Sequence, residues 1–149
     1  MSAIPLQQLH IEDLVLIQDT IARYNRSIDA GDRGEYLSLF TKDAIKENLN
    51  VWGTLRGIEE IARAFDEYSS SPSFANFRDG QHWVTNLIID DVKAGRVETW
   101  SNYAFWVPTP DGPKLLVMGT YHDVFVKQDG RWLFEKRVIK GLLRVDRAA

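Results

Sequence analysis

The first pattern along the chain is a helical one, over residues 11–30. Its apolar residues follow one another at intervals of three and four, which places them on one face of an α-helix: Leu14, Ile17, Ile21, Tyr24 and Ile28. The segment Ala30-Gly31-Asp32 interrupts the pattern, and Gly31 is a suitable C-terminal cap. Shorter apolar patterns predict two further helices, at 34–40 and 58–68.

After residue 44 the pattern changes to period two, which is typical of β-strands. Residues 44–52 alternate, and one face carries Ile45, Glu47, Leu49 and Val51. The segment 69–80 is polar and contains a proline, so it is predicted to be a loop, either a lid or a plain connection. Four longer strands are then predicted at 82–92, 97–107, 114–127 and 131–145, with Asp129-Gly130 as the hairpin turn between the last two.

This order of elements predicts an α+β fold. We expect a cone-shaped α+β barrel, with three N-terminal helices packed in a strongly curved antiparallel sheet. The 149 residues are expected to form a single domain, 1–149. Large apolar side chains occur on both faces of the predicted strands. The face away from the helices is therefore expected to meet another copy of the chain, in a homo-oligomer that is a dimer or trimer.

Composition narrows the possible function classes. The net charge of -3 and the pI of about 5.6 provide no basic surface for nucleic acid or an anionic membrane. The absence of cysteine excludes disulfides, thiolate nucleophiles and cysteine-based zinc sites. The first residues, MSAIPLQQLH, lack the pattern of a signal peptide, and no stretch approaches the roughly 18 apolar residues of a membrane span. We therefore expect a cytoplasmic protein.

Two polar residues interrupt apolar surroundings and are candidates for chemistry. Asp29 lies where the apolar face of the first helix ends, and His82 opens a strand that is apolar on both faces. Each residue alone is also explained by a solvated helix end or by a hydrogen-bonded structural histidine. If the two meet in the interior, the carboxylate fixes the imidazole tautomer and stabilises its protonated form, as a general base requires. Tyr24, on the same helix, would then donate to a developing oxyanion.

Five segments together resemble a known superfamily: IEDLVLIQDTIARYNRSIDAGD, YLSLFTKDA, WGTLRGIEEI, HWVTN and GTYHDVFVKQDGRWLFEKRV. They resemble the nuclear-transport-factor-2-like superfamily and, within it, the SnoaL-like group, close to scytalone dehydratase, bile-acid dehydratase and hexachlorocyclohexane dehydrochlorinase. Members that carry out eliminations have a Tyr or Lys five residues before an Asp, which Tyr24 and Asp29 match. They also have a His opening the first long strand, like His82, and often an Arg shortly after a Trp in the last strand, like Arg137.

The resemblance implies a cofactor-free lyase or isomerase, dehydratase-like, that abstracts a proton from a small hydrophobic and cyclic substrate without a metal. Asp29, His82 and Tyr24 are the expected catalytic residues. Six residues are expected to contact the substrate: Arg137, Asn86, Trp52, Trp83, Tyr103 and Phe125. By alternation, Asn86 shares the strand face of His82, and Arg137 shares that of Glu135, to which a salt bridge is the alternative role. His122 is interpreted as structural or exposed.

Two alternatives use the same fold without catalysis. One is a ligand-binding or scaffold protein, in which the polar residues serve stability or recognition. The other is a protein like the small subunit of a ring-hydroxylating oxygenase. Contact between Asp29 and His82 beside an open apolar cavity favours the enzyme, whereas a cavity filled by Trp and Phe side chains favours the binding or scaffold protein.

Overall fold

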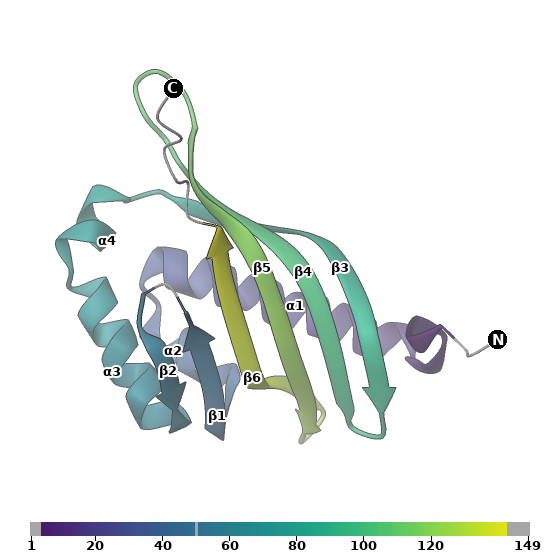
Figure 1. Cartoon of the computed structure of the whole chain (residues 1–149). Coiled ribbons are helices and arrows are strands. Elements are labelled where there is room, and N and C mark those ends of the chain that lie inside the picture. The colour runs from purple at the N-terminus through teal and green to yellow at the C-terminus, as the bar shows by residue number, and fades with distance from the viewer. Residues whose placement is uncertain (1–3, 50, 143–149) are drawn as a thin grey trace.

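The chain forms a curved, unclosed sheet around one long helix (Figure 1). The computed structural model describes residues 4–49 and 51–142. The helical elements are η1 (Pro5–Gln8), α1 (Ile11–Ala30), α2 (Arg33–Ser38), α3 (Gly57–Ser69) and α4 (Pro72–Asn76). The strands are β1 (Phe40–Asn48), β2 (Gly53–Arg56), β3 (Gln81–Lys93), β4 (Arg96–Val107), β5 (Lys114–Gln128) and β6 (Arg131–Leu142). Their order in the sheet is β2-β1-β6-β5-β4-β3.

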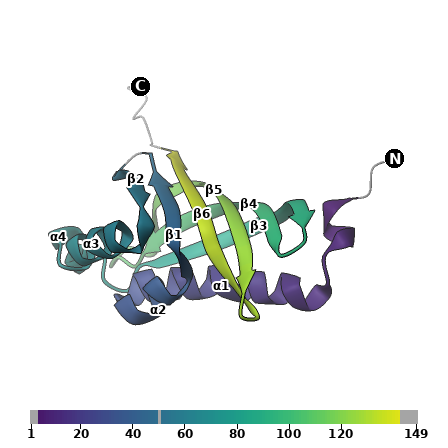
Figure 2. The ribbon, with the colours of Figure 1, turned by 90° about the horizontal axis from the view of Figure 1, so that it is seen from below.

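Helix α1 follows the predicted pattern. Ile17, Ile21, Tyr24 and Ile28 are all buried, and they form the core together with the inner face of the sheet. Gly31 ends the helix in the left-handed conformation, with a φ of 70°, and its N–H reaches the carbonyl groups of the last turn. Viewed from below, α1 runs across one side of the sheet, and α3 lies beside the edge formed by β2 (Figure 2). The predicted α+β cone is thereby confirmed.

The sheet differs from the prediction in one pairing. The β3–β4, β4–β5 and β5–β6 pairs are antiparallel, whereas β1 pairs with β6 in parallel. No hairpin fixes the relative direction of β1 and β6, because four strands separate them in the sequence. Short elements also occupy segments predicted to be irregular, namely β2 after Trp52 and α4 within 69–80. Residues 143–145 of the predicted last strand lie outside the described residues.

Two register shifts change which side chains face inward. Near Asn86, which has a φ of 57°, the β3–β4 register shifts between Thr85 and Ile88. Leu87 and Ile89 consequently join the side of His82, in place of the predicted Asn86 and Ile88. The β5–β6 register shifts between Val124 and Phe125 of β5, and this shift changes which side chains of β6 face inward. Its inward residues are Trp132, Phe134, Arg137 and Ile139, and not Leu133 or Glu135. Bulges of this kind break strict alternation.

The outer face of the sheet carries exposed apolar side chains, including Trp83, Ile88 and Met118, which are between 50% and 54% exposed. His122 also lies exposed on β5. Within the described part of the chain, no helix has both the length and the apolar character needed to cross a membrane.

Candidate active site

Asp29 and His82 are in direct contact. One carboxylate oxygen of Asp29 lies 2.5 Å from Nδ1 of His82, and the other accepts the backbone N–H of His82 at 2.8 Å. The two side chains are 16% and 15% exposed, so the pair is largely shielded from water. The contact joins residues 53 positions apart, and it is the contact on which the roles expected of the two residues depend.

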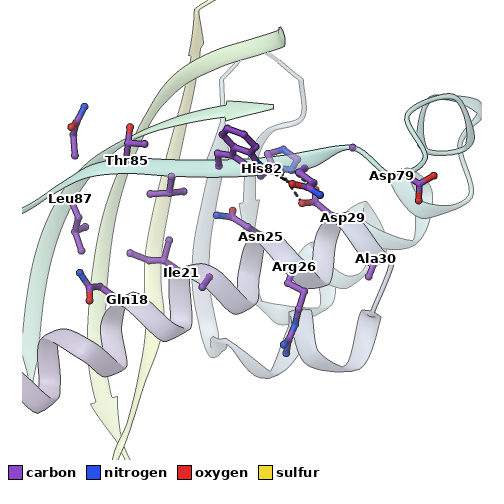
Figure 3. Close-up of a pocket in the computed structure, with 16 residues that line it drawn as sticks. Gln18, Ile21, Asn25, Arg26, Asp29, Ala30, Asp79, His82, Thr85 and Leu87 are labelled. Carbon is purple, nitrogen blue, oxygen red and sulfur yellow. Dashed lines mark hydrogen bonds and ion pairs between the residues drawn. The ribbon is translucent and has the colours of Figure 1, made fainter. Parts of the chain in front are cut away.

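Local structure explains why these two residues meet. Asp29 occupies the last turn of α1 and His82 the start of β3, where that strand passes the end of the helix (Figure 3). Strand β3 is an edge strand, so its outer backbone groups lack a neighbouring strand. The Asp29 carboxylate satisfies one such N–H while it holds the imidazole ring. The ring of His82 is also stacked on Phe105, with centroids 4.3 Å apart, which fixes its plane.

His82 separates two hollows. The outer one is an open groove of about 840 Å³ between α1 and β3, lined by residues that include Asp29, Arg26 and Asn86 (Figure 3). The inner one is a cavity of about 480 Å³ within the curve of the sheet, and Asp29 does not line it. Ligand cavities typically measure about 300–1,000 Å³ and are mainly apolar. The inner cavity is the better candidate for a hydrophobic substrate because aromatic side chains make up much of its wall: Tyr24, Trp52, Tyr68, Phe77, Tyr103, Phe105 and Tyr121.

Three of the predicted residues line this inner cavity beside His82: Tyr24, Trp52 and Tyr103. Tyr24 is buried against the rings of Tyr36 and Phe134. Tyr103 stacks on Tyr121, with ring centroids 4.4 Å apart. Because about 480 Å³ of this cavity is open space, it is not filled by Trp and Phe side chains.

The other four predicted substrate contacts lie elsewhere. Phe125 is fully buried against Phe134 in the core and lines neither hollow. Asn86 and Trp83 line the outer groove. The bulge turns Asn86 away from the inner cavity, and Trp83 belongs to the outer face of the sheet. Asn86 donates to the side chain of Asn102 there.

Arg137 is fully buried behind the wall of the cavity. Its Nε lies 3.0 Å from Asp123, and its guanidinium carbon lies 3.7 Å from the ring centroid of Tyr121 and 4.0 Å from that of Tyr24. The salt bridge with Glu135 considered from the sequence is not formed, since Glu135 pairs with Arg96. Arg137 therefore supports the cavity wall from behind, which differs from the substrate contact expected of it.

Three charged side chains form a row across neighbouring strands. The register pairs Asp123 of β5 with Arg137 of β6, and Arg137 with Lys46 of β1. All three are buried, at no more than 2% exposure. Burial raises the pKa of Asp123 from 3.8 to about 6, although Arg137 opposes that shift. Burial lowers the pKa of Lys46, and the nearby Tyr24 opposes this.

Sequence reasoning missed Lys46, which lines the inner cavity. The alternation in 44–52 drew attention to Ile45, Glu47 and Leu49, whereas the inner face of β1 carries Ala44, Lys46 and Asn48. The available signal was the other face of the same alternation, on which Lys46 lies two residues after Ala44. Within residues 4–49 and 51–142, no group of three His, Cys, Asp or Glu side chains is placed to hold a metal ion.

Comparisons with known proteins agree with this architecture. A family model described as a SnoaL-like domain matches residues 9–138. The fold is similar to that of a Mycobacterium tuberculosis protein of unknown function, at 27% identity and a TM-score of 0.74, covering 89% of this chain and 73% of that one. It is also similar to a Novosphingobium aromaticivorans protein provisionally described as a scytalone dehydratase, at 20% identity and a TM-score of 0.74, covering 89% and 86% of the two chains.

A further structural likeness is to LinA, at 21% identity and a TM-score of 0.72, covering 89% of this chain and 92% of that one. At these identities the last two likenesses concern the fold alone. No curated protein sequence matches the chain significantly.

Proposed function

Because the chain belongs to the SnoaL-like domain family, we propose that it is a cofactor-free lyase or isomerase acting by general acid–base catalysis on a small hydrophobic, cyclic substrate. The family includes dehydratases and isomerases. The observation that carries the proposal is the Asp29–His82 pair, whose imidazole lines a cavity of about 480 Å³ with several aromatic rings in its wall. A structural histidine needs no open cavity beside it, whereas a general base does.

Each residue of the pair has a distinct role in the proposed reaction. Asp29 faces Nδ1 of His82, which leaves Nε2 as the nitrogen that receives a proton. The base takes a proton from a substrate carbon next to a carbonyl group, and the electron pair of the C–H bond becomes a C=C bond while the π electrons of the carbonyl move to its oxygen, giving an enolate. The carbonyl then re-forms, and either a β-leaving group departs with its bonding electron pair or the proton returns at another carbon. Assistance of this kind accelerates a reaction by about 10²–10⁴-fold, and Asp29 stabilises the imidazolium that forms.

The test measures the first step, which does not require the natural substrate to be known. A panel of cyclic ketones and β-hydroxy ketones is incubated with the protein in deuterated water, and exchange of the α-proton and loss of water are followed by NMR. We expect exchange for at least one ketone, and a loss of at least about 100-fold in Asp29→Asn and in His82→Gln. His122→Gln is the matched control, because His122 is exposed on the opposite face.

Two outcomes contradict the proposal. Variants at Asp29 or His82 that keep their fold by circular dichroism and also keep full exchange would exclude the pair as the base. A wild-type protein that binds ketones of the panel without exchanging their protons would favour the ligand-binding alternative.

A further inference from the structure

Lys46 is a buried cation whose side chain reaches the inner cavity. It lies on β1, is 1% exposed and is among the residues of the cavity wall. Its ammonium group donates to the hydroxyl of Tyr36 at 2.7 Å and lies 4.7 Å from the ring centroid of Trp52. No carboxylate lies within ion-pair distance of Lys46 among the residues that the structure describes. Among the described residues, the charge is thus held by the hydroxyl groups of Tyr36 and Tyr24 and by aromatic faces.

The neighbouring charges leave this cation uncompensated. In the row across the strands, Lys46 stands next to Arg137, a second buried cation, and Asp123 is the only carboxylate of the row. Asp123 is already engaged by Arg137 at 3.0 Å. Like charges at paired positions of a sheet repel each other, and an unpaired buried charge is costly. Glu67 also lines the cavity, but it is exposed.

We propose that Lys46 binds an oxyanion of the substrate, so that the cavity selects ring compounds bearing a phenolic or enolic oxygen. The proposal rests on the function proposed above, because it concerns the same cavity, and it specifies the substrate class. When His82 removes the proton from carbon, the electron pair forms the C=C bond and the carbonyl electrons move to oxygen. Lys46 then receives the negative charge of the enolate in a water-poor site, where such an interaction is strongest.

The number of donors on Lys46 allows this contact. An ammonium group has three N–H donors, and among the described residues the hydroxyl groups of Tyr36 and Tyr24 account for two of them. The aromatic rings around the ammonium group carry no negative charge that would neutralise it. An oxyanion of a ligand in the cavity would supply that charge. A site that hydrogen-bonds an oxygen of its substrate also rejects analogues that lack this oxygen. The cavity should therefore discriminate strongly between an ionised phenol and the same ring without its oxygen.

The experiment uses 4-nitrophenol and nitrobenzene as probes, at pH 8, where the phenol is ionised. Binding is followed by the absorbance change of the phenolate and by calorimetry. We expect wild type to bind 4-nitrophenolate at least about 10-fold more tightly than nitrobenzene, and Lys46→Met to lose that preference while its affinity for nitrobenzene is retained. Lys42→Met is the matched control, since Lys42 lies exposed on the same strand. If Lys46→Met does not fold, Lys46→Gln replaces it.

The outcomes separate this proposal from the previous one. Equal binding of 4-nitrophenolate by wild type and the Lys46 variant, or no preference over nitrobenzene in wild type, overturns the role of Lys46 and leaves the base intact. The exposed His122, on the opposite face of the sheet, supplies a second control, and His122→Gln is expected to bind 4-nitrophenolate as wild type does. If His122→Gln loses the probe as Lys46→Met does, the anion is bound elsewhere and the proposal fails.

Discussion

Replacement of Arg137 by Met is predicted to destabilise the fold in a pH-dependent way. Methionine keeps much of the side-chain volume but removes the guanidinium that lies 3.0 Å from Asp123 and 3.7 Å from the ring of Tyr121. Both members of this ion pair are fully shielded from water. Breaking a buried pair by removing one partner typically costs about 3–5 kcal/mol, because the other charge remains uncompensated.

The pH dependence follows from the carboxyl group that remains. In the native protein the pKa of Asp123 is raised from 3.8 to about 6. A raised native pKa means that the associated stability is fully present below the unfolded value and is lost as the pH rises, by about 3 kcal/mol in total. In wild type that loss ends near pH 6. Without Arg137 the native pKa is higher still, so the loss continues above pH 6 at about 1.4 kcal/mol per unit.

Urea unfolding at pH 6 and pH 8, followed by tryptophan fluorescence, measures this difference. We expect the stability gap between wild type and Arg137→Met to be wider at pH 8 than at pH 6. Arg96→Met is the control, since Arg96 pairs with Glu98 and Glu135 at a partly exposed site, where the cost should stay below about 1 kcal/mol. A cost for Arg137→Met below 1 kcal/mol, or a gap that narrows towards pH 8, would refute the reasoning.

Three further predictions concern packing and assembly. Gly119→Ala should destabilise the protein by about 1–3 kcal/mol in thermal unfolding, because a Cβ there would clash with the carbonyl oxygen of Lys140; an unchanged melting temperature would contradict it. Trp132→Phe should cost about 1–2 kcal/mol through loss of the 2.8 Å indole bond to Asp13, and a cost below about 0.5 kcal/mol in urea unfolding would contradict it. We also propose that the outer face forms a homo-oligomer, so Trp83→Glu, at a side chain 54% exposed, should lower the mass seen by sedimentation; a monomeric wild type rules this out.

The sequence predicted the helix–strand contact better than it predicted the faces of the strands. Asp29 and His82 could be placed because one ends a periodic helix and the other opens a strand, and both positions are marked by local pattern. Asn86 lies within one bulge and Arg137 follows another, and a single extra residue reverses which side chains point inward. Strict alternation therefore assigned Asn86 to the cavity and paired Arg137 with Glu135.

Lys46 and Asp123 illustrate a second reason. Their burial depends on neighbours contributed by β1, β5 and β6, which a local pattern does not contain. The parallel pairing of β1 with β6 brings Lys46 beside Arg137, and no turn sequence announces that pairing. The pairing of β1 and β5 with β6 places these charges in one row, and the local sequence pattern does not reveal that pairing.

The hydrogen bond from the main chain of His82 to Asp29 ties assembly of the site to the docking of a border strand. Any opening that peels the beginning of β3 from the end of α1 removes the imidazole from its anion and breaches the wall between groove and cavity at the same moment. Formation of the Asp29–His82 pair and closure of the cavity are consequently one cooperative event in this fold, and amide hydrogen exchange at His82 would report on both.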